Sequence, residues 1–524
     1  MKSFKIKIFV TGLTTLLWAC DLDYKENPNE ITDPPTSGLL NDATKKMMDD
    51  LYDEWFQGRF TLVTMQYWTQ SEYADEDRYV YRESQRETWE DFYANLENLR
   101  KVLYLNTNED TRVENSQYGA NENQIAVVRI LMAWTFNVMA DTWGDIPYYS
   151  YGSDDADFQA LRVADVEEEI LSPAYASQEK IYADILNELQ EAEAMIDEAA
   201  LGVVGDNIYG GEENQMALWK KFANSLRLRV ALKISGVNPS LAETHINDAI
   251  SKGVFTSNEE NAGFTYESSD VNAAPIYRAF NVSNRKDFAI SHPFCQMLLG
   301  NNLVDHDGND ITDNPFSGIR DPRLEMYAIP NSNGDFVGMP VNESSSEAQV
   351  FVWESLPGDK IINVPNYTQT LMEFAEVSFI LSELNNWNQT HYENGVRASM
   401  QKWGVPTEDI DAYIAALPPA SEETVLTQKY ISLYMDAHTA WQEYRRTGYP
   451  QTLILPGTEF SVTPVAGTTI DYTFSSLVDG ITDIPFRMQY PDFERTLNGD
   501  NRRQAVSNLD NGDALNSKLW WDVN

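Results

Sequence analysis

The stretch Ala133–Ser150, AWTFNVMADTWGDIPYYS, decides the fold of this chain. Its helix should be buried among other helices, because a helix without a wide polar face has no side to turn to water. Glycine accepts the left-handed turn that ends a helix, so we expect the helix to stop at Trp143-Gly144, with Pro147 just beyond. Apolar side chains recur at three-to-four-residue steps before and within the stretch, at Ile125, Val128, Met132, Phe136 and Met139.

Further segments with helical periodicity predict a mainly α-helical chain. The helices come in pairs with alanine and aromatic residues at their contacts, which is typical of tetratricopeptide-like hairpins, although no strict repeat is visible. Ser240 and Glu243 have the spacing of a capping box at the start of one helix. The other predicted helices are Leu39–Phe60, Trp89–Leu105, Gln178–Asp197, Met216–Ile234, Thr370–Asn385, Tyr392–Trp403 and Glu423–Arg445.

We expect one domain over residues 39–524, in three parts. Residues 39–252 form helical hairpins, and residues 367–524 form closing helices followed by an irregular C-terminal segment. Between them, residues 253–366 are rich in Gly, Pro, Asn and Ser and have few periodic runs. Because long ordered loops usually carry function, this irregular, loop-rich half is expected to face the ligand.

The first 19 residues are predicted to be a secretion signal. Lysines precede the apolar run IFVTGLTTLLWA, which is too short to span a membrane. Leu17–Cys20 resembles a bacterial lipobox, with Trp18 a loose fit, so Cys20 is the expected lipid attachment site; an ordinary signal that contains a cysteine is the alternative. Acidic residues after Cys20 resemble the surface-export signal of Bacteroidetes lipoproteins, and residues 20–38 are expected to be a flexible tether.

Composition narrows the range of ligands. The formal net charge is −43, and a chain this acidic repels phosphate backbones, which argues against nucleic-acid binding. The sequence contains 13 Trp, 27 Tyr and 22 Phe. That is more than we expect to be buried, so some of these rings should face a ligand or partner.

The candidate ligand-binding residues lie in loops. Tyr67–Tyr81, YWTQSEYADEDRYVY, has no clean period and mixes aromatic rings with acids and an arginine. Flat aromatic faces stack on sugar rings or peptide side chains, although an aromatic loop folded onto the core would have the same composition. The candidates are Trp68, Tyr73, Arg78 and Tyr79, followed by Tyr277 and Arg278.

No motif for catalysis is present. The sequence contains no GxSxG elbow, HExxH helix or phosphate loop. His292 and Cys295 are close in sequence, but we interpret Cys295 as a buried structural thiol. The oxygen-rich turn Asp305–Asp313 would suit calcium, yet its glycine falls two places too early for an EF-hand loop, so a solvated acidic turn is favoured. We therefore expect no cofactor and no metal.

Taken together, several segments resemble the SusD/RagB family of outer-membrane nutrient-binding lipoproteins, most closely its second SusD-like branch. The order and spacing of these segments along nearly the whole chain carry the resemblance. They are MADTWGDIPYYS (139–150), LWKKFANSLRLRVALKIS (218–235), IRDPRLEMY (319–327), LMEFAEVSFILSEL (371–384), YENGVRASMQKWGV (392–405), QKYISLYMDAHTAWQEYRRTGYP (428–450), IPFRMQYPDFE (484–494) and KLWWD (518–522).

The resemblance implies a lipid-anchored protein on the outer membrane, facing the cell exterior, as the lid of a SusC-like TonB-dependent transporter. It would bind an oligosaccharide and would not be an enzyme. A peptide-capturing lid, a secreted glycan-cleaving enzyme and a purely structural repeat scaffold are the alternatives. The recurrent motifs are expected to be scaffold: Asp145, Arg445 and Arg446 as buried or partly buried ion-pair members that lock the C-terminal segment to the helices, and Trp520-Trp521 as packing for the chain end.

Overall fold

The buried helix predicted from the sequence is present as α4 (Asn121–Trp143) in a computed structural model that describes residues 34–161, 170–344, 354–464 and 467–523. Every residue of α4 from Asn123 to Trp143 is buried. By length and apolarity α4 would also suit a membrane span, but here it is fully enclosed by protein. The helix ends where Gly144 takes a φ of 97°, a conformation that a residue with a side chain adopts only with strain.

The C-terminal end of α4 is held by segments far away in the sequence. The last carbonyls of a helix lack partners within it and must find them elsewhere when the end is buried. Arg445 Nη1 donates to the carbonyl of Asp141 at 2.9 Å, and the Met488 amide donates to that of Thr142 at 2.8 Å. Arg487 Nη2 donates to the carbonyl of Trp143 at 2.9 Å. The WGDIPYY corner is therefore a junction of the scaffold.

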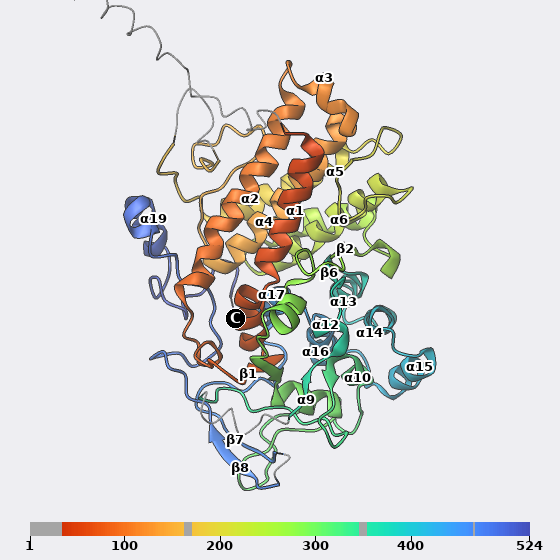
Figure 1. The fold of residues 1–524 in the computed structure, drawn as a ribbon, viewed down its shortest axis with the longest axis vertical. Helices are drawn as coiled ribbons and strands as arrows, with labels where there is room; N and C mark the ends of the chain where they lie inside the picture. Colours follow the sequence, from red (N-terminus) through yellow and green to blue (C-terminus); the bar gives the residue numbers. More distant parts are fainter. Residues whose placement is uncertain (1–33, 162–169, 345–353, 465–466, 524) are drawn as a thin grey trace, which may run out of the picture. The chain divides into compact units, whose positions relative to one another are not determined.

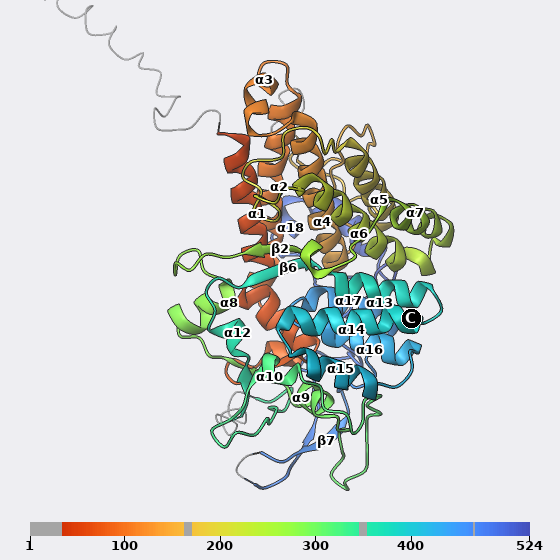
Figure 2. The same cartoon turned by 90° about the vertical axis from the view of Figure 1, so that its right-hand side faces the viewer.

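Consecutive helices pack as pairs, as the sequence predicts. Helix α1 (Thr36–Leu51) lies along α2 (Glu83–Thr107), and α4 lies along α5 (Gln178–Met195) (Figure 1). Figure 2 shows the closing helices gathered below this group. The other paired helices are α6 (Gln215–Lys233) with α7 (Pro239–Lys252), α13 (Phe374–Leu384) with α14 (Gln389–Trp403), and α16 (Glu422–Ser432) with α17 (Ala437–Thr447).

Two predicted helices are each divided. Leu39–Phe60 is wrong as one α-helix, because α1 ends at Leu51 and a nine-residue π-helix, η1 (Glu54–Leu62), follows it. Glu423–Arg445 is likewise two helices, separated by a turn in which Met435 has a φ of 71°. The residues of both helices and of the turn between them are almost all buried, so the apolar periodicity of the sequence continues through the break.

Two smaller expectations also need correction. Helix α7 begins at Pro239, and its cap is Asn238, whose Oδ1 accepts from the Leu241 amide at 3.3 Å. The predicted capping box of Ser240 and Glu243 is therefore wrong, because the cap lies two residues earlier than predicted. Helix α1 begins at Thr36, so the last residues of the predicted tether 20–38 belong to the folded unit, which runs from Thr36 to Asn524.

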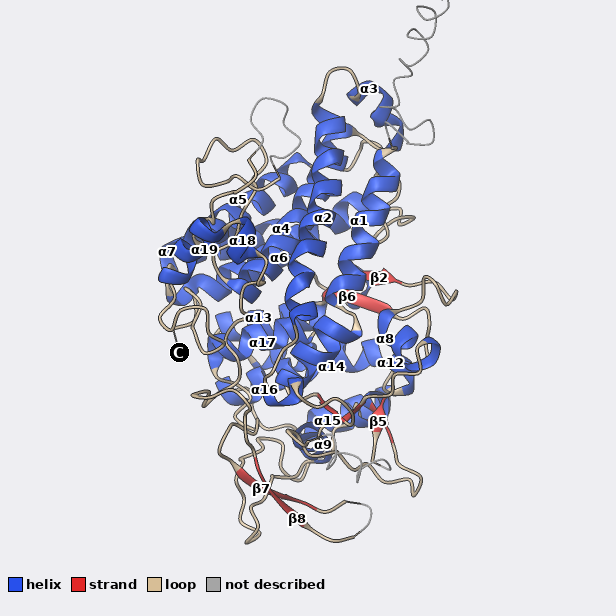
Figure 3. Ribbon diagram, turned by 60° about the vertical axis from the view of Figure 1, so that its left-hand side comes forward, coloured by secondary structure: helices blue, strands red, loops and turns tan. Residues whose placement is uncertain are grey.

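The strands are short and form antiparallel pairs in the described structure (Figure 3). Three pairs join segments distant in sequence: β1 (Trp68–Gln70) with β3 (Phe288–Ile290), β2 (Ala262–Thr265) with β6 (Thr368–Met372), and β4 (Ala328–Ile329) with β5 (Leu356–Pro357). The fourth pair, β7 (Glu459–Val462) with β8 (Ile470–Thr473), is a local hairpin. The other helices used below are η2 (Glu76–Arg78), α8 (Pro275–Tyr277), α9 (His292–Leu299) and α12 (Asp359–Ile362).

Candidate ligand-binding site

The two loop regions expected to bind ligand meet in the structure. Strand β1 follows the start of the Tyr67–Tyr81 segment, and it pairs with β3, which belongs to the loop-rich half. The Ser71 amide then donates to the carbonyl of Asp287 at 2.7 Å, extending the junction beyond the strands. Long-range pairing thus fixes one predicted loop against the other.

Two of the six candidate residues are core residues, and their interpretation as ligand platforms is wrong. Trp68 has no exposed surface; its Nε1 donates to the hydroxyl of Tyr434 at 2.8 Å, and its ring lies 5.4 Å from that of Phe288. Tyr79 is 2% exposed and packs edge-on against Phe474 at 5.4 Å. Both rings are enclosed by protein on all sides, so no ligand can stack on them.

Of the other residues in this loop, Tyr73 is accessible and Arg78 is tied back. Tyr73 is 58% exposed and adopts a left-handed φ of 55°, which points to a fixed turn rather than a regular strand. Arg78 Nη2 lies 2.9 Å from the carboxylate of Asp75, and its side chain is only 19% exposed. Tyr73 remains the best ligand-facing candidate of the original set.

Tyr277 and Arg278 serve a different contact. Tyr277 ends the short helix α8 and is half-buried against the core. Arg278 Nη2 lies 3.3 Å from Asp49 Oδ2, so the arginine joins this segment to α1. In the described structure, no hydrogen bond or ion pair connects Tyr277 or Arg278 to Tyr73.

The sequence analysis missed Trp55, which lies in the π-helix η1 next to the junction of the loops. Its half-buried indole ring is surrounded by guanidinium groups, with Arg59 Cζ at 5.1 Å, Arg285 Cζ at 5.1 Å and Arg82 Cζ at 5.6 Å from the ring centroid. These distances suit cation–π contact. The side chains of Arg82 and Arg285 are 41% and 40% exposed, so they present donors to solvent. We call Trp55, Arg82, Arg285 and Tyr73 the loop surface.

Carboxylates beneath the loop surface hold its arginines in place. Arg59 is fully buried and forms an ion pair with Asp287, and its Nη1 lies 3.7 Å from Glu76. Glu76, also buried, lies 2.7 Å from Arg82 Nε. Glu54 lies 3.7 Å from Arg285 Nε. Three arginines thus face three carboxylates, so the cluster is balanced in charge within a strongly acidic chain.

The start of η1 is fixed by a half-buried cap, Asp53. Asp53 Oδ1 accepts from the amides of Trp55 at 2.8 Å and Phe56 at 2.6 Å. Burial nevertheless raises the pKa of Asp53 to about 8, since the two amide donors offset only part of the desolvation. The Gln57 amide is 1% exposed and has no hydrogen-bond partner among the described residues. π-helical turns recur at functional sites. This one begins at a fixed cap and contains the side-chain amide of Gln57, which has no hydrogen-bond partner among the described residues.

The loop surface has the chemistry of a saccharide site. Stacked guanidiniums offer several N–H donors in fixed directions, which can bind sugar hydroxyls. An exposed tyrosine ring offers a flat face to sugar C–H groups. Trp55 acts as the support that keeps Arg82 and Arg285 together.

The WGDIPYY corner lies beside a different cavity, of about 460 Å³, lined by Asp145, Gln178 and Trp520 among others. Asp145 accepts from the Gln178 amide at 2.9 Å and from Asn508 Nδ2 at 2.8 Å. Burial raises the pKa of Asp145 above its usual value. Its partners are amides, so the expected ion pair is replaced by hydrogen bonds, while its role in holding the C-terminal segment is confirmed.

The other scaffold residues hold the closing helices and the chain end in place. Arg446 pairs with Glu383 at 2.7 Å and with Glu443 at 2.8 Å, which confirms a partly buried ion-pair role. Arg445 donates to backbone carbonyls, including that of Phe486 at 2.7 Å. Trp521 is buried and donates to the hydroxyl of Tyr182 at 2.8 Å, so the chain end is packed as expected.

The His292–Cys295 pair lacks the properties of a nucleophile and its base. Both residues are buried in α9. Burial raises the pKa of the Cys295 thiol to about 12 and lowers that of His292 to about 4. A thiol with such a raised pKa stays protonated at neutral pH and is not a nucleophile, which agrees with the interpretation of Cys295 as a structural residue.

The turn Asp305–Asp313 uses its acids internally. Asp305 Oδ1 accepts from the backbone amides of Asp307 and Asn309, both at 2.9 Å. Among the described residues, no group of three or more His, Cys, Asp or Glu side chains is arranged to hold a metal ion. The geometry is that of a turn closed by its own side chain.

Comparison with known proteins identifies the family. Residues 28–463 match the model described as "Starch-binding associating with outer membrane", SusD-like, and residues 419–522 match that of the SusD and RagB outer-membrane lipoproteins. A search of curated proteins gives no match.

Solved structures agree with this assignment. A SusD homologue from Parabacteroides distasonis is 21% identical, with a TM-score of 0.72 over 93% of this chain and 98% of that one. A chitin-binding protein is 23% identical, with a TM-score of 0.71 over 93% and 100%. A chitin-binding SusD homologue from Flavobacterium johnsoniae is 22% identical, with a TM-score of 0.68 over 93% and 99%. The chain therefore belongs to the SusD/RagB family of outer-membrane proteins, has its mainly α-helical fold, and is a binding protein rather than an enzyme.

Proposed function

We propose that the protein is a lipoprotein of the outer cell surface that binds an oligosaccharide and delivers it to a SusC-like TonB-dependent transporter, for which it acts as a lid. The lipid anchor would be at Cys20, which lies outside the described residues. The description of the family as starch-binding supports a saccharide ligand, and so do the two similar structures described as chitin-binding.

The observation that carries the proposal is the loop surface. Arg82 and Arg285 are held over Trp55 in a cluster whose charges balance. Tyr73, whose ring is exposed, follows β1, the strand that pairs with β3 just after Arg285. Balanced charge favours a neutral ligand with many hydroxyl groups. The net charge of the whole chain, −43, also disfavours anionic glycans.

Calorimetric titration of the mature protein with neutral oligosaccharides, among them starch- and chitin-derived ones, tests the ligand class. Peptides of similar length form the second arm. We expect at least one saccharide to bind. Trp55→Ala should weaken its affinity by about tenfold or more, because the variant loses the ring that holds the donors of Arg82 and Arg285 in place. Tyr104→Ala, which removes an aromatic ring that is 48% exposed on α2, is the matched control. Binding of peptides alone would instead establish the peptide-capturing alternative.

The cellular part of the proposal has its own tests. A Cys20→Ala variant should no longer incorporate labelled fatty acid and should leave the membrane fraction. Protease added to intact cells should digest the wild-type protein, and a TonB-dependent transporter should co-purify with it. A Cys20→Ala variant that stays membrane-bound would rule out the proposed anchor.

A further inference from the structure

The end of the folded unit where α1 begins carries exposed apolar side chains. Figures 1 and 2 show α3 (Arg112–Asn115) at the same end. Leu201 is 57% exposed, Val204 is 49% exposed, and Val113, on α3, is 79% exposed. Single apolar residues are ordinary on a protein surface, so the meaning of these depends on what lies beside them.

Backbone contacts fix these side chains beside the start of the folded chain. The Val204 amide donates to the carbonyl of Tyr118 at 2.8 Å. The backbone of Gly205 lies directly against that of Ser37, in the first turn of α1, and leaves no room for a side chain at Gly205. Leu201 and Val204 therefore lie at the point where the predicted tether joins the folded unit.

An open, acidic cavity of about 350 Å³ adjoins the same stretch. Its lining includes Gly202 together with the carboxylates of Glu198, Glu212 and Glu213. Glu198 lies 2.9 Å from Lys220. Glu212 and Glu213 are exposed, and neither has an ion pair in the described part of the chain. Among the described residues no Lys or Arg lines the cavity, so its negative charge is open to solvent.

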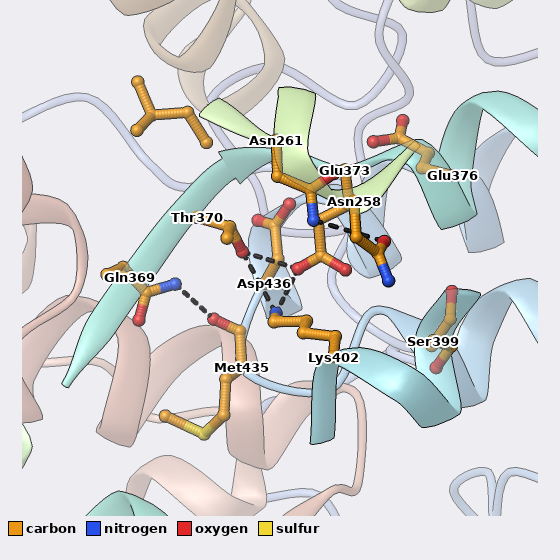
Figure 4. A network of polar contacts seen from close by, with 12 residues as sticks. Asn258, Asn261, Gln369, Thr370, Glu373, Glu376, Ser399, Lys402, Met435 and Asp436 are labelled. Atoms are coloured by element: carbon orange, nitrogen blue, oxygen red, sulfur yellow. Dashed lines mark hydrogen bonds and ion pairs between the residues drawn. The ribbon is translucent and has the colours of Figure 1, made fainter. Parts of the chain in front are cut away.

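Carboxylates in the interior are neutralised by the chain itself. In the polar network of Figure 4, Glu373 forms an ion pair with Lys402. Glu376, in the same network, forms one with Arg229. Such groups have no charge left for an external partner. The two unpaired glutamates of the cavity have both charge and access, which suits a basic side chain supplied from outside.

The tether sets where this end of the molecule can be. With a lipid at Cys20, as proposed above, residues 20–35 join the membrane to the start of α1. A coil of this length spans about 20 Å on average and about 55 Å at most. The end that carries Leu201 and Val204 is therefore kept near the membrane and near the outer rim of a transporter embedded in it.

We propose that Leu201, Val204, Glu212 and Glu213, here called the entry surface, dock an extracellular loop of the transporter that carries a Lys or Arg beside apolar side chains. The basic group pairs with the two glutamates in the cavity, and its apolar neighbours cover Leu201 and Val204. This inference rests on the proposed function and names the surface by which the lid holds its partner.

Charge argues against the other candidate occupants. Anionic lipid headgroups would meet carboxylates of their own sign, and so would the entry surface of a second copy of this chain. The tether itself contains five acidic residues and one lysine between Asp21 and Pro35, so the cavity repels it as well. A basic protein loop is the occupant that the charge favours.

The test measures the affinity of the lipidated protein for the TonB-dependent transporter that co-purifies with it, by titration of the two purified proteins in detergent. We expect the double variants Leu201→Gln/Val204→Gln and Glu212→Gln/Glu213→Gln each to weaken binding about tenfold. The effect of the glutamate pair should shrink at high salt, because its charge is exposed. Saccharide affinity should be unchanged in both, because the loop surface is separate.

Two matched controls alter the same residue types elsewhere. Glu408→Gln/Asp409→Asn removes two neighbouring, exposed carboxylates on α15 (Thr407–Ala416), which have no ion pair in the described structure. Leu497→Gln changes an apolar side chain that is 62% exposed. Both controls should bind the transporter as the wild type does. Unchanged melting temperatures would show that all variants are folded.

A photo-crosslinking amino acid in place of Leu201 identifies the occupant directly. We expect it to crosslink to the transporter, and the same amino acid in place of Leu497 not to do so. A crosslink to lipid or to a second copy, or unchanged transporter affinity in both double variants, would overturn the entry surface and leave the lid function in place. A wild-type protein that binds saccharide but no TonB-dependent transporter would overturn the proposed delivery and this surface with it.

Discussion

The end of α4 and the loop surface use the same residue types for different purposes. At the end of α4, Arg445 lies 3.5 Å from the Trp441 ring centroid, and its guanidinium binds backbone carbonyls from two remote segments. At the loop surface, Arg82 and Arg285 also lie over a tryptophan, but their side chains are 41% and 40% exposed. The guanidinium donors of Arg445 bind carbonyls of the scaffold, whereas those of Arg82 and Arg285 are open to solvent. We use this distinction to separate structural arginines from ligand-binding ones.

The largest expected effect breaks the scaffold side of this comparison. Arg445→Ala removes a stacked side chain and leaves two buried carbonyls without donors, so we expect the free energy of unfolding to fall by about 3–5 kcal/mol. Urea unfolding measures it. Arg495→Ala is the control, because Arg495 is 62% exposed and forms a surface pair, where a change within about 0.5 kcal/mol is expected. A loss below about 1 kcal/mol for Arg445→Ala would contradict the scaffold role.

The next effect depends on pH and concerns the cap that supports Trp55. The pKa of Asp53 is raised from 3.8 to about 8, so its protonated form is favoured in the folded state. The stability this gives is complete below about pH 4 and is lost as the pH rises towards 8. Asp53→Asn keeps the accepting oxygen without the charge, and we expect it to gain about 1–3 kcal/mol relative to the wild type between pH 5 and pH 9.

Chemical unfolding at several pH values measures this change. Asp110→Asn, on an exposed loop, removes the same charge and should show no such trend. A difference between wild type and Asp53→Asn that stays constant over this range would show that the cap is not a desolvated carboxyl group.

A smaller effect sharpens the ligand side. Tyr73→Ala removes an exposed ring, so the free energy of unfolding should stay within about 0.5 kcal/mol while saccharide affinity falls about two- to tenfold. Parallel thermal unfolding and calorimetry separate the two quantities. Tyr104→Ala should leave the saccharide affinity unchanged. An affinity loss equal to that of Tyr73→Ala would show that the effect of removing an exposed tyrosine is not specific to the loop surface.

The smallest effect concerns the turn Asp305–Asp313. Because Asp305 already accepts from two backbone amides of the turn, millimolar calcium or EDTA should shift the melting temperature by less than about 1 °C. Differential scanning calorimetry with each additive measures the shift. A rise of several degrees with calcium would place an ion among these acids.

The sequence predicted the α-helical fold because α4 is apolar on nearly every side and ends at a glycine and a proline. It did not reveal the break before α17, since an apolar face can continue across two helices. The π-helix η1 also escaped prediction, because a wider helical turn leaves no distinct spacing in a short segment.

The site was predicted by segment and only partly by residue. The Tyr67–Tyr81 loop and the loop-rich half do meet, but which rings are buried depends on the β1–β3 pairing between segments more than 200 residues apart. Trp68 lies in that pairing and is buried, whereas Tyr73 lies just beyond it and is exposed. Trp55 was assigned to a regular helix, where an aromatic residue is normally part of the core.

A crystal structure of the protein with its tightest-binding neutral oligosaccharide tests the central claim most directly. We predict a sugar within hydrogen-bond distance of Arg82 and Arg285, next to the ring of Tyr73, with the end of α4 unchanged. Density for the sugar at the corner near Asp145 and Trp520, with the loop surface empty, would contradict the account.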